Sequence, residues 1–156
     1  NVNRINVISA QDMSQASLES AVKNQIFIGC AAVADYRVAE VADQKIKKSG
    51  DEISIKLIKN PDIISDVGHL KTHRPFTVGF AAETQNVDDY AKDKLERKNL
   101  DMICANDGSG GQVFNADENA LQLFWKDGHK KLSLKSKVEL AADLVNESIE
   151  RYQKTL

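Results

Sequence analysis

The chain has 156 residues, which is the size of a single domain. Its 21 lysine and arginine residues nearly balance 23 aspartate and glutamate residues, so the formal net charge is −2. This balance argues against a protein that coats nucleic acid or binds a membrane surface, because both classes carry a large basic excess. Hydrophobic residues make up 42% and charged residues 28% of the chain, as in folded domains, so intrinsic disorder is not expected.

Apolar stretches in the chain are short. The longest, around residues 26–33, is far below the roughly 20 residues that a helix needs to cross a bilayer. The first residues also lack the basic, apolar and small-residue blocks of a signal peptide. We therefore expect a cytoplasmic protein with no membrane and no nucleic-acid partner. Cys30 and Cys104 lie in apolar stretches and are predicted to be buried free thiols.

The first third of the chain predicts a strand, a helix and a second strand. Arg4–Ile8 alternates weakly and is predicted as a strand. A capping-box pattern at Ser9–Asp12 predicts a helix over Gln11–Asn24. The continuous apolar run Gln25–Ala32 is typical of a strand that is covered on both faces.

The segment that follows predicts a loop, a turn and a strand. Val33–Gln44 has no clean period and is expected to be a loop, while Lys45–Asp51 is expected to be a turn or flap. Alternation over Glu52–Lys59 predicts a strand. Asn60 followed by Pro61 predicts the start of a helix, with Asn60 as its N-cap residue.

The second half repeats the order strand, helix, strand. Strands are predicted over Pro75–Ala82 and Asp101–Ala105, with a helix over Val87–Lys98 between them. A short extended piece, a hairpin and a final helix that begins with a capping box follow at Gln112–Phe114, Leu121–Trp125, Lys131–Leu134 and Ser136–Glu139. The apolar face of the final helix is predicted to consist of Val138, Ala141, Ala142, Val145, Ile149 and Tyr152.

This order of elements predicts an α/β fold. Alternating strands and helices favour a Rossmann-like three-layer α/β/α domain with a mostly parallel sheet, and the late hairpin adds an antiparallel extension near the C-terminus. No linker or low-complexity segment divides the chain. Residues 1–156 are therefore expected to form one domain. Because the first residue is Asn1 and the first methionine is Met13, we expect this domain to lack its N-terminal segment.

Three predicted strand ends are candidates for a binding site, because open α/β sheets bind ligands beyond the carboxyl ends of their strands. Two of them, Gly29–Ala32 and Gly79–Ala82, share the pattern Gly-X-Ala-Ala, and the third is Cys104–Asp107. Small residues there either let a ligand approach the backbone or fit tight helix–sheet packing. Both interpretations stay open at this point.

Lysines gather near those ends. Lys94 and Lys98 are one helical turn apart, a repulsion that an anionic ligand would relieve and a solvated helix face would tolerate. The basic run 45–48 precedes a Ser-Gly turn and also fits a solvated loop. The predicted helix start at Asn60 offers free N–H groups to a phosphate, although Asp62 partly occupies that position.

Other motifs are weak. Tyr90 and Lys94 match the Tyr-x-x-x-Lys pair of short-chain dehydrogenases, but Tyr90 falls on the predicted apolar face and the chain has no Gly-x-Gly-x-x-Gly. The three histidines lack the spacing of metal ligands. Neither cysteine has a partner at the spacing of a nucleophilic or metal-binding motif.

Six segments carry a more specific pattern, namely Gly29–Tyr36, Gln44–Lys48, Lys59–Ile63, Gly79–Thr84, Lys94–Asp101 and Cys104–Asp107. Together they resemble the phosphopantothenate–cysteine ligase (phosphopantothenoylcysteine synthetase) family. In bacteria this ligase is the C-terminal half of a bifunctional coenzyme A biosynthesis flavoprotein. The resemblance extends from about Asn3 to Tyr152.

The resemblance implies an activity. The family joins 4′-phosphopantothenate to L-cysteine with CTP and Mg²⁺, through an acyl-cytidylate, in coenzyme A biosynthesis. Lysines, Mg²⁺ and backbone donors suit such a reaction, because it depends on positioning and charge neutralisation. The resemblance further implies a homodimer, and FMN only in a decarboxylase domain that belongs to the longer protein.

The resemblance also implies roles for individual residues. Lys45 matches the catalytic flap lysine, which is tied to conversion of the acyl-cytidylate, and Asp35 matches a residue at the nucleotide and metal site. Lys94 and Lys98 match lysines of the triphosphate site. The remaining nucleotide-binding positions are Gly29, Cys30 and Ala31 at the strand end, with Phe80 and Asn60, Pro61, Asp62 and Ile63 around the base and ribose.

The chain departs from the family in several places. The family's Gly-rich loop and its Ser-Ser-Gly-Lys stretch are not in this sequence, and Asp43–Gln44 stands where relatives often carry Pro-Glu. We therefore hypothesise that the 156-residue chain keeps much of the CTP pocket but does not form the acyl-cytidylate alone. Two alternatives stay open: a non-catalytic nucleotide-binding remnant, and an NAD(P)-dependent short-chain oxidoreductase.

Overall fold

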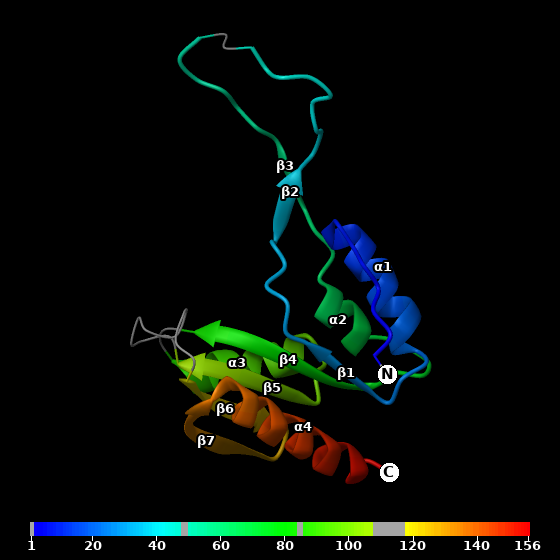
Figure 1. Cartoon of the computed structure of the whole chain (residues 1–156), viewed down its shortest axis with the longest axis vertical. Helices are drawn as coiled ribbons and strands as arrows, with labels where there is room; N and C mark the ends of the chain where they lie inside the picture. Colours follow the sequence, from blue (N-terminus) through cyan, green and yellow to red (C-terminus); the bar gives the residue numbers. More distant parts are fainter. Residues whose placement is uncertain (1, 48–49, 84–85, 108–117) are drawn as a thin grey trace.

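The computed structural model describes residues 2–47, 50–83, 86–107 and 118–156. Five strands form one sheet in the order β1-β4-β5-β6-β7 (Figure 1). β1, β4 and β5 pair in parallel, β6 is antiparallel to both of its neighbours, and β7 therefore runs in the same direction as β5. The strands are β1 Ile26–Gly29, β4 Phe76–Glu83, β5 Met102–Asp107, β6 Glu118–Trp125 and β7 Gly128–Ser136.

Helices cover both faces of this sheet. α2 (Ile63–Gly68) and α3 (Val87–Arg97) pack on one face, and α1 (Ala10–Ala21) packs against α2. α4 (Lys137–Gln153) covers the other face. The alternation of β5 separates the two cores: Ile103 clusters with Leu95 of α3, whereas Met102 clusters with Leu144 of α4. The predicted three-layer α/β/α architecture with a C-terminal hairpin is confirmed.

Two helices begin where the sequence predicts, because their first turns satisfy their own N–H groups. The Ser9 hydroxyl accepts a hydrogen bond from the Asp12 N–H at 3.1 Å, and the Asp12 carboxylate accepts one from the Ser9 N–H at 3.0 Å. Ser136 and Glu139 repeat this capping box at the start of α4. The hydrogen bonds from Ser9 and Ser136 lower the pKa of Asp12 and of Glu139.

A long arm projects from the body of the domain (Figure 1). Its described residues are 36–47 and 50–59: β2 (Tyr36–Val38) and β3 (Leu57–Lys59) form a separate antiparallel pair at its base, and residues 39–47 and 50–56 extend beyond them. The prediction of a loop over Val33–Gln44 was wrong at β2, and only the last three residues of the predicted strand Glu52–Lys59 are strand. The alternating pattern of residues 52–56 did not produce a longer strand, and none of the described strands of the body pairs with β2 or β3.

Two further sequence predictions were wrong. Arg4–Ile8 is not a strand, and Ile8 is fully exposed. On α4, the side chains that face the sheet include Leu140, Leu144 and Ser148, whereas most of the predicted apolar face is exposed. The exposed members are Val138, Ala141, Ala142, Val145 and Ile149. The helix has two apolar faces, and the face with the larger leucine side chains packs on the sheet.

The predicted extended piece Gln112–Phe114 lies outside the described residues. In the part of the chain that the structure describes, no helix has the length and apolar character needed to cross a membrane.

Candidate functional site

A cavity of about 420 Å³ lies beyond the carboxyl end of β1. Its volume is in the range of small-molecule sites, which are about 300–1,000 Å³. The segment after β1 and the segment between β3 and α2 form its walls, together with parts of α1 and β4 and the residue that ends α3. Among its lining residues are ten that the sequence predicted, namely Gly29, Cys30, Ala31, Asp35, Asn60, Pro61, Asp62, Ile63, Phe80 and Lys98.

An ion pair crosses one side of the cavity. Lys98 Nζ lies 3.1 Å from Asp62 Oδ1, and the same carboxylate oxygen accepts a hydrogen bond from the Ser65 N–H at 3.3 Å. The Lys98 and Asp62 side chains are 21% and 36% exposed. A pair that water reaches to this extent is worth little, so a phosphate can compete for Lys98 at low cost.

The N-cap of α2 is Asp62, so the prediction that Asn60 caps this helix was wrong. Asn60 is buried, and it binds the segment that follows β1 instead. Its N–H donates to the Asp35 carbonyl and its Nδ2 donates to the Ala34 carbonyl, both at 2.8 Å. Asp62, two residues after Asn60, caps the helix instead, because its Oδ1 accepts a hydrogen bond from the Ser65 N–H.

Asp66 lies in the first turn of α2, close to the cavity's ion pair. Burial and the neighbouring Asp62 carboxylate raise the pKa of Asp66, and His69 opposes that shift. The raised pKa of Asp66 thus reflects the negative charge of Asp62, whose carboxylate is paired with Lys98.

The glycines of the Gly-X-Ala-Ala repeats lie in close contact with apolar side chains. A Cβ at Gly29 would lie 2.8 Å from Ile64 Cδ1, and a Cβ at Gly79 would lie 2.7 Å from Leu100 Cδ1. Both distances are too short, so a larger residue at either position would have to displace the end of that side chain. Gly29 also lines the cavity, so at that position tight packing and access to the site coincide.

The two cysteines have different environments. Cys104 is fully buried, and burial raises its pKa to about 12. Cys30 is exposed and lines the cavity, so the prediction that both thiols are buried was wrong for Cys30. The apolar run that suggested burial ends with the strand at Gly29, one residue before Cys30.

Three predicted positions lie elsewhere. Lys94 is on α3, one turn before Lys98, but is not among the described residues that line the cavity. Lys45 belongs to residues 39–47 of the arm, a segment that extends away from the body (Figure 1). It is not among the residues that line the cavity of its own chain. Tyr90 is 51% exposed on α3 rather than part of its apolar face.

The donor set of the cavity fits Mg²⁺ only together with a substrate. Asp35 and Asp62 are the carboxylates among its described lining residues, and the described chain holds no group of three or more His, Cys, Asp or Glu side chains that could bind a metal. Mg²⁺ is usually held by one or two carboxylates plus substrate phosphates. Two carboxylates beside a triphosphate therefore satisfy its requirements.

Sequence reasoning missed the cavity residues that come from α1. Met13 and Ser17 line the cavity because α1 packs against α2, and this contact between helices cannot be predicted from the local sequence. It also missed Arg37, which lies in β2 and binds Asn60. The residues around Arg37 show no strand pattern, so the sequence did not indicate which way the Arg37 guanidinium would point.

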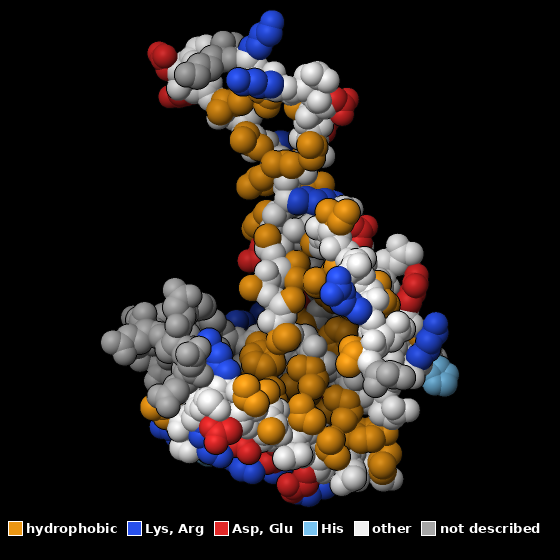
Figure 2. Space-filling model, in the orientation of Figure 1, with side chains coloured by type: hydrophobic (Ala, Val, Ile, Leu, Met, Phe, Trp, Pro, Cys, Tyr) orange, Lys and Arg blue, Asp and Glu red, His pale blue; other side chains and the backbone are white. Residues whose placement is uncertain are grey.

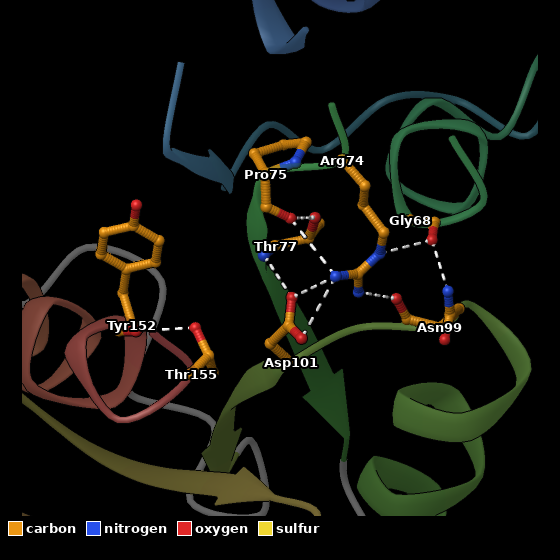
Figure 3. Close-up of polar contacts among 8 residues, drawn as sticks. All are labelled: Gly68, Arg74, Pro75, Thr77, Asn99, Asp101, Tyr152 and Thr155. Carbon is orange, nitrogen blue, oxygen red and sulfur yellow. Dashed lines mark hydrogen bonds and ion pairs between the residues drawn. The ribbon is translucent and has the colours of Figure 1, made fainter. Parts of the chain in front are cut away.

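A second polar cluster lies at the opposite end of the sheet, where β4 and β5 begin (Figure 3). Arg74 Nε donates to the Gly68 carbonyl at 2.7 Å, its Nη2 donates to the Asn99 carbonyl at 2.5 Å, and its Nη1 lies 2.9 Å from an Asp101 carboxylate oxygen. Asp101 also accepts from the Thr77 N–H at 2.7 Å. Asn99 has φ 51°, the left-handed conformation that an Asn tolerates, so its carbonyl can face Arg74. These residues join the end of α2 to the starts of two strands.

Three layers of helices and sheet, with a charged cavity at a strand's carboxyl end, define the class of open α/β domains in which the strand ends are the candidate place for a small-molecule site. The family model described as DNA/pantothenate metabolism flavoprotein C-terminal domain matches residues 1–152. The chain belongs to this family.

Curated relatives and solved structures agree with this membership. The chain is 96% identical over 156 residues to the coenzyme A biosynthesis bifunctional protein CoaBC of Haemophilus influenzae, and 56% identical over 155 residues to that of Escherichia coli. These matches cover 100% and 97% of this chain but 39% and 38% of the relatives, so the chain spans about two fifths of their length.

A crystal structure of the C-terminal domain of CoaBC matches with a TM-score of 0.76 and 34% identity, over 97% of this chain and 66% of the solved chain. A flavoprotein structure from Streptococcus pneumoniae, described with the same DNA/pantothenate metabolism name, is 22% identical with a TM-score of 0.73. It covers 94% of this chain and 71% of the solved one, and it supports the fold alone.

Proposed function

We propose that this domain catalyses the CTP-dependent ligation of 4′-phosphopantothenate to L-cysteine in coenzyme A biosynthesis. One observation carries the proposal: a single cavity at a strand end combines a lysine (Lys98), two carboxylates (Asp35 and Asp62) and an aromatic wall (Phe80). A triphosphate needs a cation, Mg²⁺ needs carboxylates, and a pyrimidine base needs an apolar face. Membership of a pantothenate metabolism family supports the same assignment.

The proposed chemistry has two steps. A carboxylate oxygen of phosphopantothenate attacks the α-phosphorus of CTP, and the bond to pyrophosphate breaks. The cysteine amine then attacks the acyl carbon, the amide bond forms, CMP leaves and the amine proton passes to solvent. Lys98 would hold phosphate oxygens, while Phe80 and Ile63 would flank the base. Mg²⁺, when bound by Asp35 and Asp62 with the phosphates, would supply further neutralisation of the triphosphate charge.

Lys45 requires a separate account, because its segment extends away from the cavity of its own chain (Figure 1). We propose that the arm of a second subunit supplies this lysine. Mixed dimers of a Lys45→Gln chain and a Lys98→Ala chain test this. If Lys45 acts across the dimer, each mixed dimer keeps one complete site and its activity exceeds that of either parent dimer. If it acts within its own chain, no complete site remains and the mixture is as inactive as the parents.

The arm also supports the predicted homodimer. Six of its large apolar side chains are more than half exposed, namely Tyr36, Val41, Ile46, Ile53, Ile55 and Leu57. Figure 2 shows apolar side chains along the arm. The β2–β3 pair leaves strand edges that a second arm can extend. Light scattering after gel filtration should give a dimer for the full-length protein and a smaller species for Ile53→Lys with Ile55→Lys. Leu134→Lys, which changes an exposed residue of β7 outside the arm, should stay dimeric.

The proposed function also concerns the part of the longer relatives that this chain does not cover. The relatives are bifunctional, and this chain spans about two fifths of their length. We propose that the remainder contains an FMN-dependent decarboxylase domain, in keeping with the flavoprotein name of the family. A cytoplasmic location remains part of the same proposal.

Calorimetric titration of the full-length protein with CTP and with ATP, each with Mg²⁺, tests the proposed site. We expect selective CTP binding that Lys98→Ala weakens. Lys92→Ala is the matched control, because it removes an exposed lysine from the same helix outside the cavity. Equal affinity for CTP and ATP, or an equal effect of the two variants, would contradict the proposal.

Activity assays separate the alternatives. The ligase should accumulate acyl-cytidylate when cysteine is omitted, detected by mass spectrometry, and Lys45→Gln should slow its conversion to product. A nucleotide-binding remnant would bind CTP but form no acyl-cytidylate in the full-length protein. A short-chain oxidoreductase would instead reduce a nicotinamide cofactor. The same assay on the 156-residue chain tests whether it forms the intermediate alone.

A further inference from the structure

The cavity has two walls that are distant in sequence, and one side chain joins them. The first wall contains Ala34 and Asp35, after β1, and the second contains Lys59, the last residue of β3, and Asn60, which follows it. Asn60 donates from its N–H to the Asp35 carbonyl and from its Nδ2 to the Ala34 carbonyl, each at 2.8 Å. Because Asn60 is buried, these bonds are shielded from water, and they set the spacing between the walls.

Arg37 determines which way the Asn60 amide faces. Its Nη1 donates to the Lys59 carbonyl at 2.7 Å and to Asn60 Oδ1 at 3.2 Å. A guanidinium has only donors, so the oxygen of the amide must face Arg37 and the nitrogen must face Ala34. Among the described residues, no carboxylate forms an ion pair with Arg37. Its charge is thus directed at these two neutral oxygens, which strengthens both bonds.

Arg37 belongs to the arm rather than to the cavity. It lies in β2, opposite Ile58 of β3 at the base of the arm, and it does not line the cavity. The rest of the arm carries exposed apolar side chains suited to a partner. A displacement of the arm would therefore move the guanidinium and release the amide that joins the two walls.

We propose that Arg37 is a positioning residue that couples the arm to the nucleotide cavity through the Asn60 amide. The cavity then has its binding shape only when the base of the arm is in place. This proposal rests on the proposed function, since it takes the cavity to be the nucleotide site. As a consequence, contacts that hold the arm in place also tighten nucleotide binding.

Steady-state kinetics of the full-length protein test the proposal with three variants. Arg37→Met should raise the KM for CTP about tenfold, as expected for the loss of hydrogen bonds from a charged donor, and should change kcat less. Arg37→Lys should recover part of the loss, because it keeps a charged donor without the fork. Lys56→Met removes a neighbouring exposed charge from the same arm and should leave the KM unchanged.

Hydrogen exchange provides a readout that does not depend on activity. In Arg37→Met, the Asn60 amide proton should exchange faster, because its acceptor wall is released, whereas the amide protons of β4 and β5 should keep their protection. Combining Arg37→Met with Asn60→Ala should cost no more CTP affinity than Asn60→Ala alone, since both changes break the same connection.

Several results would overturn the proposal. An unchanged KM and unchanged Asn60 exchange in Arg37→Met would do so. A purely structural role of Arg37 would also overturn the proposal. In that case Arg37→Met would lower both kcat and thermal stability, and Arg37→Lys would recover neither. Failure of the proposed function is distinct: the unaltered protein would bind no CTP, and exchange at Asn60 would then still decide whether Arg37 holds the two walls together.

Discussion

The two ends of the central sheet use similar residues for different purposes. At the amino ends of β4 and β5, Arg74 and Asp101 are bound to each other, to Asn99 and Gly68, and to the start of β4 (Figure 3). At the carboxyl end of β1, Lys98 meets Asp62 in one partly exposed ion pair beside a cavity. Charged residues whose bonding capacity is used within the fold stabilise it, whereas those with capacity left beside a cavity are suited to a ligand.

The amino end continues into a second saturated network on α4. The Glu147 carboxylate is buried and accepts from Lys130 at 2.6 Å and from Arg151 at 2.7 Å. Arg151 in turn lies 3.7 Å above the Trp125 ring, a cation–π contact. Each charge here has a partner within the fold, so the comparison predicts large effects on stability at this end and large effects on binding at the other.

The largest expected effect is on stability at the amino end. Arg74→Met would remove one donor from the Asp101 carboxylate and from the Gly68 and Asn99 carbonyls. Asp101 keeps the Thr77 N–H and Gly68 keeps Asn99 Nδ2 as donors, and the Arg74 and Asp101 side chains are 25% exposed, so the free energy of unfolding should fall by about 1.5–3 kcal/mol. Urea denaturation measures it. Arg97→Met is the control, because its pair with Asp93 is exposed and should contribute about 0.5 kcal/mol or less. Similar losses of stability in both variants would show that the additional hydrogen bonds of Arg74 do not stabilise the fold.

A smaller effect is expected at Glu147. Burial raises the pKa of Glu147, but the hydrogen bonds and charges of Lys130 and Arg151 outweigh it, so the net pKa lies below the ordinary 4.5. Such a group stabilises the fold above the unfolded-state pKa and loses that contribution as the pH falls through the folded-state pKa. Glu147→Gln should therefore cost about 1–2 kcal/mol at pH 7 and progressively less on acidification below pH ~4.5.

The control for this prediction is Glu150→Gln. Lys154 pairs with Glu150 where both side chains are more than half exposed, so its removal should change stability little at any pH. Denaturation curves at neutral and acidic pH decide the matter, and a loss at Glu147 that grows on acidification would contradict the assignment.

The opposite pattern is expected for Lys98. The Lys98–Asp62 pair is about as exposed as the Arg74–Asp101 pair, but Asp62 is the one side-chain partner of Lys98 among the described residues, so Lys98→Met should change the free energy of unfolding by less than about 1 kcal/mol. Loss of a charged donor to phosphate should weaken CTP binding by roughly tenfold or more. Calorimetry and urea denaturation on one preparation give both values. Strong destabilisation with unchanged affinity would make Lys98 a structural residue like Arg74.

The smallest effect concerns the two thiols. Exposed Cys30 should react with a thiol reagent in the native protein, whereas Cys104, which is buried with a pKa of about 12, should react only after unfolding. Because Cys30 lines the cavity, bound CTP should slow its modification. Peptide mapping of the full-length protein measures both thiols separately. Modification of Cys30 at the same rate with and without CTP would place the nucleotide elsewhere.

Local chemistry in the sequence was sufficient for several features. The capping boxes at Ser9 and Ser136 announce their helices, because the bonds involved span only three residues. Apolar runs located β4 and β5, since strands buried on both faces are uniformly apolar. The order of these elements predicted three layers and a sheet whose carboxyl ends hold the site. The family resemblance, rather than local chemistry, then pointed to ten of the residues that line the cavity.

Tertiary structure decided the rest, because the deciding contacts join distant segments. The role of Asn60 depends on Ala34 and Arg37, which lie more than twenty residues away, and the local Asn-Pro pattern instead suggested a cap. α4 carries two apolar faces, and only contact with the sheet selects the one with Leu140 and Leu144. Lys45 and Lys98 belong to one sequence-based site, but the direction of the arm separates them within a chain. Residue types and short spacings thus determined the elements, and the family resemblance indicated the kind of site, while packing between elements determined which side chains meet at the cavity.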